Sequence, residues 1–235
     1  MKRVLYTPET LDPNLIREKL SQVKDEVSAA CTRAGRDVRD VEILTATKYV
    51  TADGLAPLAE AGITLIGENR AQDLVAKHAE YGRRFTWDFI GHLQSNKVRQ
   101  VLPLVRLIHS VDSLTVVAEI DRRAEAATNV LLEVNVSEEG SKYGIITTEI
   151  DRFLEEAAKF SKVNFTGLMT MPPLAADPEA VRSNFAALRR TATRLSQNWR
   201  GKFHFKDLSM GTSNDYVVAV EEGATIIRIG GVLFK

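Results

Sequence analysis

The chain has 235 residues, of which 44% are hydrophobic and 26% charged, and its 31 basic side chains equal its 31 acidic ones. A zero net charge provides no general attraction for phosphate backbones or anionic lipid, so the composition argues against nucleic-acid and membrane partners. No apolar run is long enough to span a bilayer, and the N-terminus lacks the apolar segment of a secretory signal, so we expect a cytoplasmic protein.

A long helix is predicted at the start of the chain. Asp12 followed by Pro13 is a helix start signal, and an apolar stripe over 15–34 ends at Gly35. Cys31 lies in this stripe and is interpreted as a small buried hydrophobe. A lone cysteine also forms no intrachain disulfide and no cysteine-based zinc site, which is typical of a reducing compartment.

Strands and helices are predicted to alternate over the rest of the chain. The expected strands cover 41–48, 64–67, 86–91, 107–111, 130–137, 164–169, 205–210 and 225–229. The expected helices cover 51–61, 70–81, a segment from 95, a segment from near 112, 147–160, the apolar stripe 181–199, and 214–222. Consecutive apolar residues, as in Thr225-Ile226-Ile227, indicate strands buried on both faces, which is typical of a parallel sheet covered by helices.

Eight strands alternating with helices favour an α/β fold, namely a single (β/α)8 TIM-type barrel with an extra N-terminal helix, as one domain over 1–235. A doubly wound open sheet is the main alternative. Only residues 230–235 follow the last predicted strand, which is too short for a full eighth helix. We therefore expect the opening helix to cover that gap.

In such a barrel the functional residues lie at the C-terminal ends of the strands. Lys48 ends the first predicted strand after a run of mainly apolar residues. Burying a charged lysine is costly, which favours the neutral amine that attacks carbonyl groups and suits a Schiff base. The alternative is a lysine that extends from the strand end into solvent.

An anion site is predicted after the last two strands. Residues 209–213, Ser-Met-Gly-Thr-Ser, precede a predicted helix, and Gly230 and Gly231 follow the final strand. Hydroxyl groups, free backbone N–H groups and glycines that permit close approach are suited to phosphate, and barrels commonly hold phosphate in these two loops. The alternative is that these are ordinary turn residues.

Arg228 shares a strand face with Ile226 and Gly230, because alternate residues of a strand point to the same side. A buried arginine needs a partner. That partner is either an internal carboxylate such as Glu68 or Asp207, or an acceptor on a bound ligand.

The histidines carry less information. His78 and His204 are interpreted as structural, whereas His92 and His109 lie at or near strand ends and are candidates to line the pocket. With one cysteine and scattered histidines, no metal-binding spacing is present, so we predict no metal site.

Several motifs, taken together, resemble the pyridoxal phosphate homeostasis protein family over about 41–233. They are Ala46-Thr47-Lys48, Gly67-Glu68-Asn69, Phe89-Ile90-Gly91-His92-Leu93-Gln94-Ser95-Asn96-Lys97, Asn135-Val136-Ser137, Ser141-Lys142-Tyr143-Gly144, Gly167-Leu168-Met169, Ser209-Met210-Gly211-Thr212-Ser213 and Arg228-Ile229-Gly230. The block over 89–97 is the most specific of these.

That family is similar to the barrel domain of alanine racemase, and the resemblance implies a bound pyridoxal 5′-phosphate (PLP) cofactor. It implies that Lys48 forms the internal aldimine, that Arg228 faces the pyridine nitrogen and that Asn69 lies beside the ring. The residues implied to hold the phosphate are Ser209, Thr212, Gly230 and Gly231. Two departures stand out: Gly231 replaces a usual threonine or serine, and Lys235 replaces the usual tail.

The resemblance implies a protein that holds and delivers the cofactor in vitamin B6 homeostasis and amino-acid balance, without established catalysis. It implies apo PLP-dependent enzymes as partners, for a monomer or weak dimer. The first alternative is a PLP-dependent amino-acid racemase. Such an enzyme needs a second proton carrier, and Tyr143 is the one tyrosine whose position in the sequence leaves it as a candidate. The second is a Schiff-base aldolase acting on a sugar phosphate.

Overall fold

Nine strands form one sheet in the computed structural model, which describes residues 5–137 and 143–234. Ser141 and Lys142 of the recognised motif, and the terminal Lys235, lie outside the described residues. The strands are β1 (Glu42–Ala46), β2 (Leu65–Glu68), β3 (Thr86–Phe89), β4 (Leu107–Val111), β5 (Thr128–Asn135), β6 (Ile145–Ile146), β7 (Val163–Met169), β8 (Asp207–Thr212) and β9 (Ile226–Ile229).

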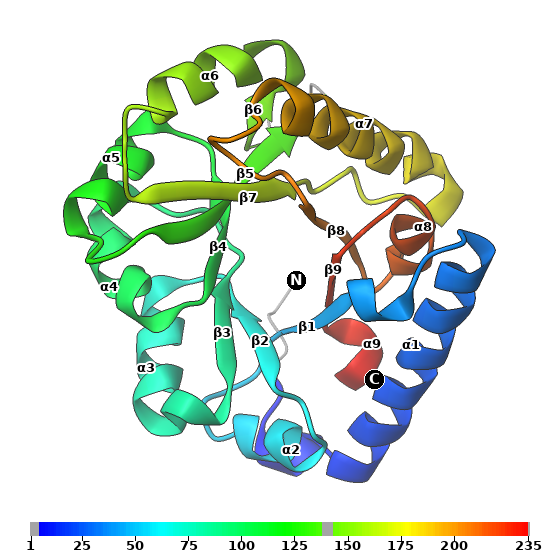
Figure 1. The fold of residues 1–235 in the computed structure, drawn as a ribbon. Helices are drawn as coiled ribbons and strands as arrows, with labels where there is room; N and C mark the ends of the chain where they lie inside the picture. Colours follow the sequence, from blue (N-terminus) through cyan, green and yellow to red (C-terminus); the bar gives the residue numbers. More distant parts are fainter. Residues whose placement is uncertain (1–4, 138–142, 235) are drawn as a thin grey trace.

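Eight of these strands close into a parallel barrel (Figure 1). Strand β1 pairs with both β2 and β9, and β4 pairs with β5, so the ring has no free edge. The two-residue strand β6 pairs with β5 and was not expected from the sequence. The predicted (β/α)8 barrel is therefore confirmed, and the open doubly wound sheet is wrong.

Helices surround the ring (Figure 1). They are α1 (Pro13–Arg33), α2 (Leu55–Glu60), α3 (Ala71–Tyr81), α4 (Val98–Val101), α5 (Leu114–Arg123), α6 (Ile150–Ala157), α7 (Arg182–Asn198), α8 (Tyr216–Glu221) and α9 (Gly231–Phe234). After β9 there is only the single turn α9, and α1 packs against both α8 and α9, as expected. Across the described ranges, no helix is long and apolar enough to cross a membrane.

Several predicted helices are shorter than expected, among them α6 and α8, and local contacts explain two other cases. Residues 51–54 form a turn before α2, because the backbone N–H and hydroxyl of Thr51 both donate to the carbonyl of Tyr6 and hold the N-terminal segment there. The helix expected from Ser95 is divided into two 3-10 turns and the short α4. Pro103 has no backbone N–H to donate to a carbonyl of the preceding turn, and the chain continues as the 3-10 turn Leu102–Leu104 after α4 ends at Val101.

The apolar core has two parts. The larger part lies between the outer face of the strands and the helices, and it includes Cys31, which is buried as expected. The smaller part contains Leu44, Leu107, Leu131, Met169 and Ile226. These five side chains come from five different strands, so they can meet only inside the ring.

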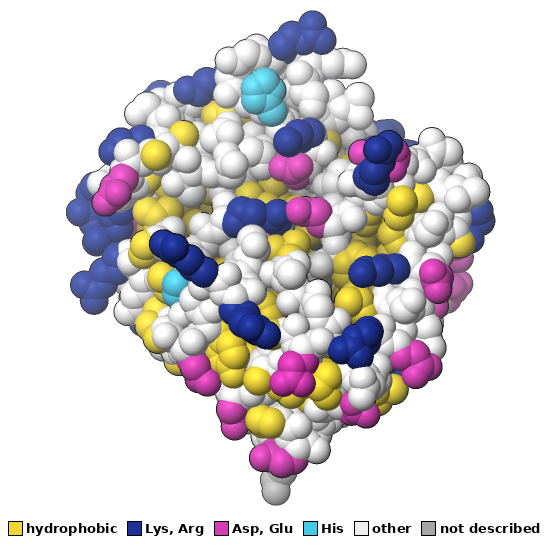
Figure 2. Space-filling model, turned by 60° about the horizontal axis from the view of Figure 1, so that its bottom comes forward, with side chains coloured by type: hydrophobic (Ala, Val, Ile, Leu, Met, Phe, Trp, Pro, Cys, Tyr) yellow, Lys and Arg dark blue, Asp and Glu magenta, His cyan; other side chains and the backbone are white. Residues whose placement is uncertain are grey.

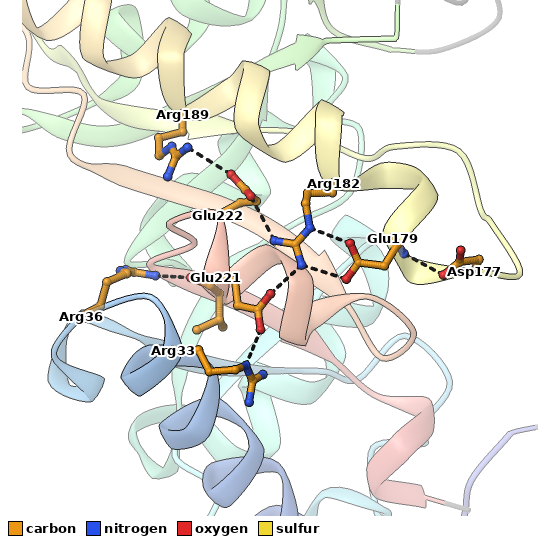
Figure 3. A network of polar contacts seen from close by, with 9 residues as sticks. Arg33, Arg36, Asp177, Glu179, Arg182, Arg189, Glu221 and Glu222 are labelled. Carbon is orange, nitrogen blue, oxygen red and sulfur yellow. Dashed lines mark hydrogen bonds and ion pairs between the residues drawn. The ribbon is translucent and has the colours of Figure 1, made fainter.

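A network of ion pairs joins α1, α7 and α8 (Figure 3). Arg182 at the start of α7 contacts Glu179 and Glu221 at 2.6 Å and Glu222 at 3.0 Å. Glu221 also accepts from Arg33 of α1 at 2.7 Å. The network therefore fastens the opening helix over the last part of the barrel.

A second ion pair, between Lys77 of α3 and Glu68 of β2, is almost fully buried, with side-chain exposures of 6% and 0%. Lys77 also donates to the carbonyl of Thr47 at 2.9 Å, and the Thr47 hydroxyl donates to Glu68 at 2.6 Å. Glu68 points outward because its neighbour Gly67 faces Leu44 inside the ring. The cluster holds the chain immediately before Lys48.

We predict that Lys77→Met lowers the free energy of unfolding by about 3–5 kcal/mol, because it leaves the buried Glu68 carboxylate without its counter-ion. The matched control is Lys159→Met, which removes a pair with Glu156 whose side chains are 65% and 50% exposed. That control should change the unfolding free energy by less than about 1 kcal/mol. Urea unfolding of both variants is the measurement, and equal losses would contradict the prediction.

Candidate functional site

Because the barrel strands run parallel, the segments that follow them meet at one end of the barrel. Lys48 lies in the turn two residues after β1, Asn69 directly follows β2, and Gly230 directly follows β9. A Cβ on Gly230 would stand 2.9 Å from the carbonyl oxygen of Ala46, and one on Gly91 would stand 2.1 Å from that of Asn69. The glycines thus permit close contact between neighbouring strand ends.

Lys48 is half-buried, and its Nζ lies 5.1 Å from the centre of the Tyr49 ring. The preceding Thr47 is completely buried and held by Lys77 and Glu68. The backbone position of Lys48 is therefore determined by a rigid neighbour on the outer side of the barrel.

The loops after β8 and β9 meet as the sequence predicted. The Ser213 hydroxyl oxygen accepts from the backbone N–H groups of Gly230 at 3.1 Å and Val232 at 3.4 Å. The N–H and hydroxyl of Thr212 both donate to Asp215, at 2.6 and 3.2 Å. These two loops bring hydroxyl and backbone N–H groups together, as an anion site, or anion cup, requires, and in this structure those donors are engaged by Ser213 and Asp215. Ser213 belongs to the predicted motif but was not among the residues expected to hold phosphate.

Asn69 supplies a further unpaired polar atom. Its Oδ1 is buried and has no hydrogen-bond partner in the structure. A buried polar atom without a partner costs free energy, so a ligand that reaches it would remove this cost.

Arg228 is only 5% exposed. Its Nη1 donates to Ser209 at 2.5 Å, and its Nη2 donates to the carbonyl of Thr170 at 2.9 Å and lies 2.8 Å from the sulfur of Met171. Burial lowers the pKa of Arg228 to about 10, which still leaves it charged at neutral pH. Glu68, one of the two carboxylates considered as its partner, lies outside the ring with Lys77.

Glu133 of β5 is the carboxyl group whose charge acts most directly on Arg228. Burial, and then the charge of Asp112, raise the pKa of Glu133 to about 7. At neutral pH this group is therefore only partly ionised, and it compensates the charge of Arg228 incompletely.

Ser209 has its hydrogen-bond partners inside the barrel. Ser209 lies within β8, as it did within the predicted strand over 205–210, and it is 0% exposed. Its hydroxyl contacts Arg228 and, at 2.9 Å, Nδ1 of His109. The phosphate contact of Ser209 stays a prediction, and in this structure its hydroxyl is engaged by Arg228 and His109.

Sequence reasoning named His109 as a candidate to line the pocket but missed its partner in this interior group. Asp88, which is 0% exposed and 3.1 Å from Nε2 of His109, was not considered. The available signal was an aspartate between the apolar residues Trp87 and Phe89 of a predicted buried strand.

Tyr143 and His92 stack at the rim of the site, with ring centres 4.1 Å apart. Nδ1 of His92 is 3.7 Å from Asp112, and the Tyr143 side chain is 62% exposed.

Within residues 5–137 and 143–234, no group of three histidine, cysteine or acidic side chains could hold a metal ion. Basic and acidic side chains both occur across the face shown in Figure 2, with hydrophobic side chains between them.

Residues 20–235 match the family described as the alanine racemase N-terminal domain. The pyridoxal phosphate homeostasis protein of Aquifex aeolicus is 38% identical over 221 residues, covering 92% of this chain and 96% of that protein. The protein of the same name from Escherichia coli K12 is 34% identical over 228 residues, covering 94% and 96%.

Solved structures agree with this assignment. PipY of Synechococcus elongatus, solved with PLP bound, has a TM-score of 0.80 and 30% identity, covering 94% of this chain and all of that one. Diaminopimelate decarboxylase of M. jannaschii, at a TM-score of 0.74 and 13% identity, shares the fold over 95% of this chain and 60% of its own. The chain therefore belongs to the alanine racemase N-terminal domain family and, within it, to the pyridoxal phosphate homeostasis proteins.

Proposed function

We propose that this protein binds PLP reversibly through Lys48 and acts in intracellular vitamin B6 homeostasis and amino-acid balance. The observation that carries the proposal is the buried Arg228, a cation with unengaged N–H groups on β9, the strand that pairs with β1 and precedes the Gly230 end of the anion cup. The same proposal includes delivery of the cofactor to apo PLP-dependent enzymes in the cytoplasm.

The residues at this end of the barrel fit the chemical groups of PLP. The cup formed by Thr212, Ser213 and the backbone N–H groups around Gly230 and Gly231 suits the phosphate. The contacts of Arg228 use three of the five N–H groups of its guanidinium, so two remain for the pyridine nitrogen. Asn69 offers its unpartnered oxygen.

Lys48 is proposed as the residue that bonds covalently to the cofactor. Bound PLP supplies an aldehyde, and a lysine amine condenses with such a carbonyl to form a carbon–nitrogen bond with loss of water. Thr47, held by Lys77 and Glu68, keeps the backbone of Lys48 in place, so the long side chain alone has to be ordered when the bond forms.

Arg228 favours a carrier over a catalyst. It can donate a hydrogen bond to a ring nitrogen, but a guanidinium that stays charged at neutral pH does not give up its proton. A ring nitrogen without a proton is a weaker electron sink, so carbanion chemistry on a bound amino acid receives little help. The racemase remains the second candidate because Tyr143 and His92 stand at the rim of the site.

We predict that the purified protein absorbs visible light and that Lys48→Ala abolishes this absorbance, because it removes the amine that bonds to the cofactor. Borohydride should fix the cofactor on the peptide that contains residue 48, as shown by mass spectrometry. The control Lys202→Ala removes an exposed lysine that lies against Phe203 and should keep the absorbance. Unchanged colour in Lys48→Ala would refute the lysine assignment, and a colourless wild type that cleaves sugar phosphates would indicate the aldolase.

A pair of glycine substitutions tests the phosphate cup. A Cβ on Gly231 would meet nothing nearer than the Ser213 hydroxyl at 4.0 Å, so Gly231→Thr fits and adds a hydroxyl donor. We expect about tenfold tighter PLP binding, since a hydrogen bond to a charged group contributes about 1.5 kcal/mol. Gly230→Ala should weaken binding, because its Cβ would stand 2.9 Å from the Ala46 carbonyl oxygen. Titration by absorbance measures both, and equal affinities would place the cup elsewhere.

We predict that the protein does not racemise amino acids at an enzymatic rate. Racemisation needs proton carriers on both faces of the cofactor, and Lys48 serves one face. Deuterium incorporation at the α-carbon of L-alanine, with chiral chromatography, is the measurement. Turnover within the usual range of about 1–10³ s⁻¹, lost in Tyr143→Phe, would instead establish the racemase.

A further inference from the structure

A continuous chain of side-chain hydrogen bonds runs through the interior of the barrel. It connects residues of β9, β8, β4 and β3 with the residue that precedes β4: Arg228 to Ser209 (2.5 Å), Ser209 to His109 (2.9 Å), His109 to Asp88 (3.1 Å), and Asp88 to Arg106 (2.8 and 3.1 Å). Ser209, His109 and Asp88 are each 0% exposed. Solvent therefore does not supply alternative partners to these three groups.

Two proton arrangements are consistent with this chain. A guanidinium has donors only, so the Ser209 oxygen accepts from Arg228; this hydroxyl then either accepts a second hydrogen bond from Nδ1 of a charged imidazolium or donates its own hydrogen to Nδ1 of a neutral imidazole. In both arrangements Nε2 carries a hydrogen and donates to the carboxylate of Asp88. We assign the second arrangement, a neutral imidazole whose Nδ1 carries no proton.

The charges around His109 agree with this assignment. Burial lowers the pKa of His109, Asp88 opposes that shift, and the cations Arg228 and Arg106 lower the pKa further. For Asp88, burial alone would raise the pKa, but hydrogen bonds from His109 and Arg106 outweigh it and lower the pKa. A neutral histidine thus stands between a cation and an ionised carboxylate.

Arg228 has no carboxylate within ion-pair distance among the described residues, and Glu133 is only partly ionised at neutral pH. A carboxylate in direct contact with arginine commonly takes two N–H groups at once. In this structure the charge of Arg228 is compensated through Ser209 and His109, and this arrangement uses only one N–H group of the guanidinium. The indirect arrangement therefore stabilises the cation and leaves more of its N–H groups for a ligand.

We propose that Ser209, His109 and Asp88 are positioning residues that hold Arg228 ready for the cofactor, through hydrogen bonds that all point from the arginine toward the carboxylate. This inference rests on the proposed binding of PLP, because it concerns the group that would meet the pyridine nitrogen. It assigns Ser209 to the arginine and leaves the phosphate to the cup around Ser213.

The first test uses the cofactor-free protein and does not depend on PLP. Nitrogen-15 NMR should show His109 protonated on Nε2 and unprotonated on Nδ1 from about pH 5 to about pH 8, whereas an ordinary histidine titrates near 6.5. In Ser209→Ala the Nδ1 resonance should shift, because its hydrogen-bond donor is gone. A proton on Nδ1, or a charged imidazole at neutral pH, would overturn the proposal.

The second test measures PLP affinity by absorbance. Ser209→Ala should weaken binding about tenfold, and His109→Leu by at least as much, since each breaks the hydrogen-bonded support of a charged group. His109→Gln, which offers both an acceptor and a donor, should recover part of the loss. Ser196→Ala is the matched control, because it too removes a hydrogen-bonded serine hydroxyl, one that donates to the carbonyl of Phe205 from α7, outside the barrel.

If Ser209→Ala binds PLP with wild-type affinity, the proposal is overturned. This variant removes a single oxygen atom, so it still provides a valid test if His109→Leu does not fold. Unfolding free energies of Ser209→Ala and Ser196→Ala separate lost stability from lost affinity. If the wild type itself does not bind PLP, the proposed function fails, while the NMR experiment still decides whether the hydrogen-bond chain has the assigned direction.

Discussion

The hydrogen-bonded chain inside the barrel is the interaction on which the rest of the site depends. A closed ring of eight parallel strands excludes solvent from its interior, so every inward polar group must find a partner there. Leu44, Met169 and their apolar neighbours fill one part of this space. Arg228 lies in the other part. It donates a hydrogen bond to Ser209, which contacts His109, which in turn contacts Asp88. Because each contact joins two strands, the chain also fixes how those strands lie against each other.

Two clusters of ion pairs outside the ring stabilise it with different strength. The pair of Lys77 and Glu68 is buried, so its loss leaves an uncompensated charge, and it holds Thr47 beside Lys48. The network around Arg182 is partly exposed, with 33% of that side chain accessible, so each of its ion pairs contributes modestly. Its role is to fasten α1 against α7 and α8 through several contacts at once.

The residues that the sequence located best are those whose position follows from strand ends alone. Asn69, Gly230 and Gly231 were expected after strands, and they lie there, whereas Lys48 was expected as the last residue of a strand and lies two residues beyond β1. Ser209 fell within the predicted strand over 205–210 and was given a phosphate contact, but its hydroxyl points inward to Arg228 and His109. Glu68 was one of two carboxylates considered as a partner of Arg228, but the alternation of β2 places Gly67 inside the ring and Glu68 outside. For Ser209 and Glu68, the side of the sheet that the side chain faces decided its partner.

The sequence alone predicted the barrel, from the alternation of apolar strands and helices, and the family, from its motifs. Both kinds of pattern are local, so they can be recognised in a single sequence. Asp88, His109 and Ser209 are 21 and 100 residues apart along the sequence, so no local pattern joins them. Only closure of the ring brings β3, β4, β8 and β9 around one axis. The partner of Arg228, and hence the state of the group that would meet the cofactor, was therefore decided by tertiary structure, since burial and hydrogen-bond geometry exist only once the barrel has formed.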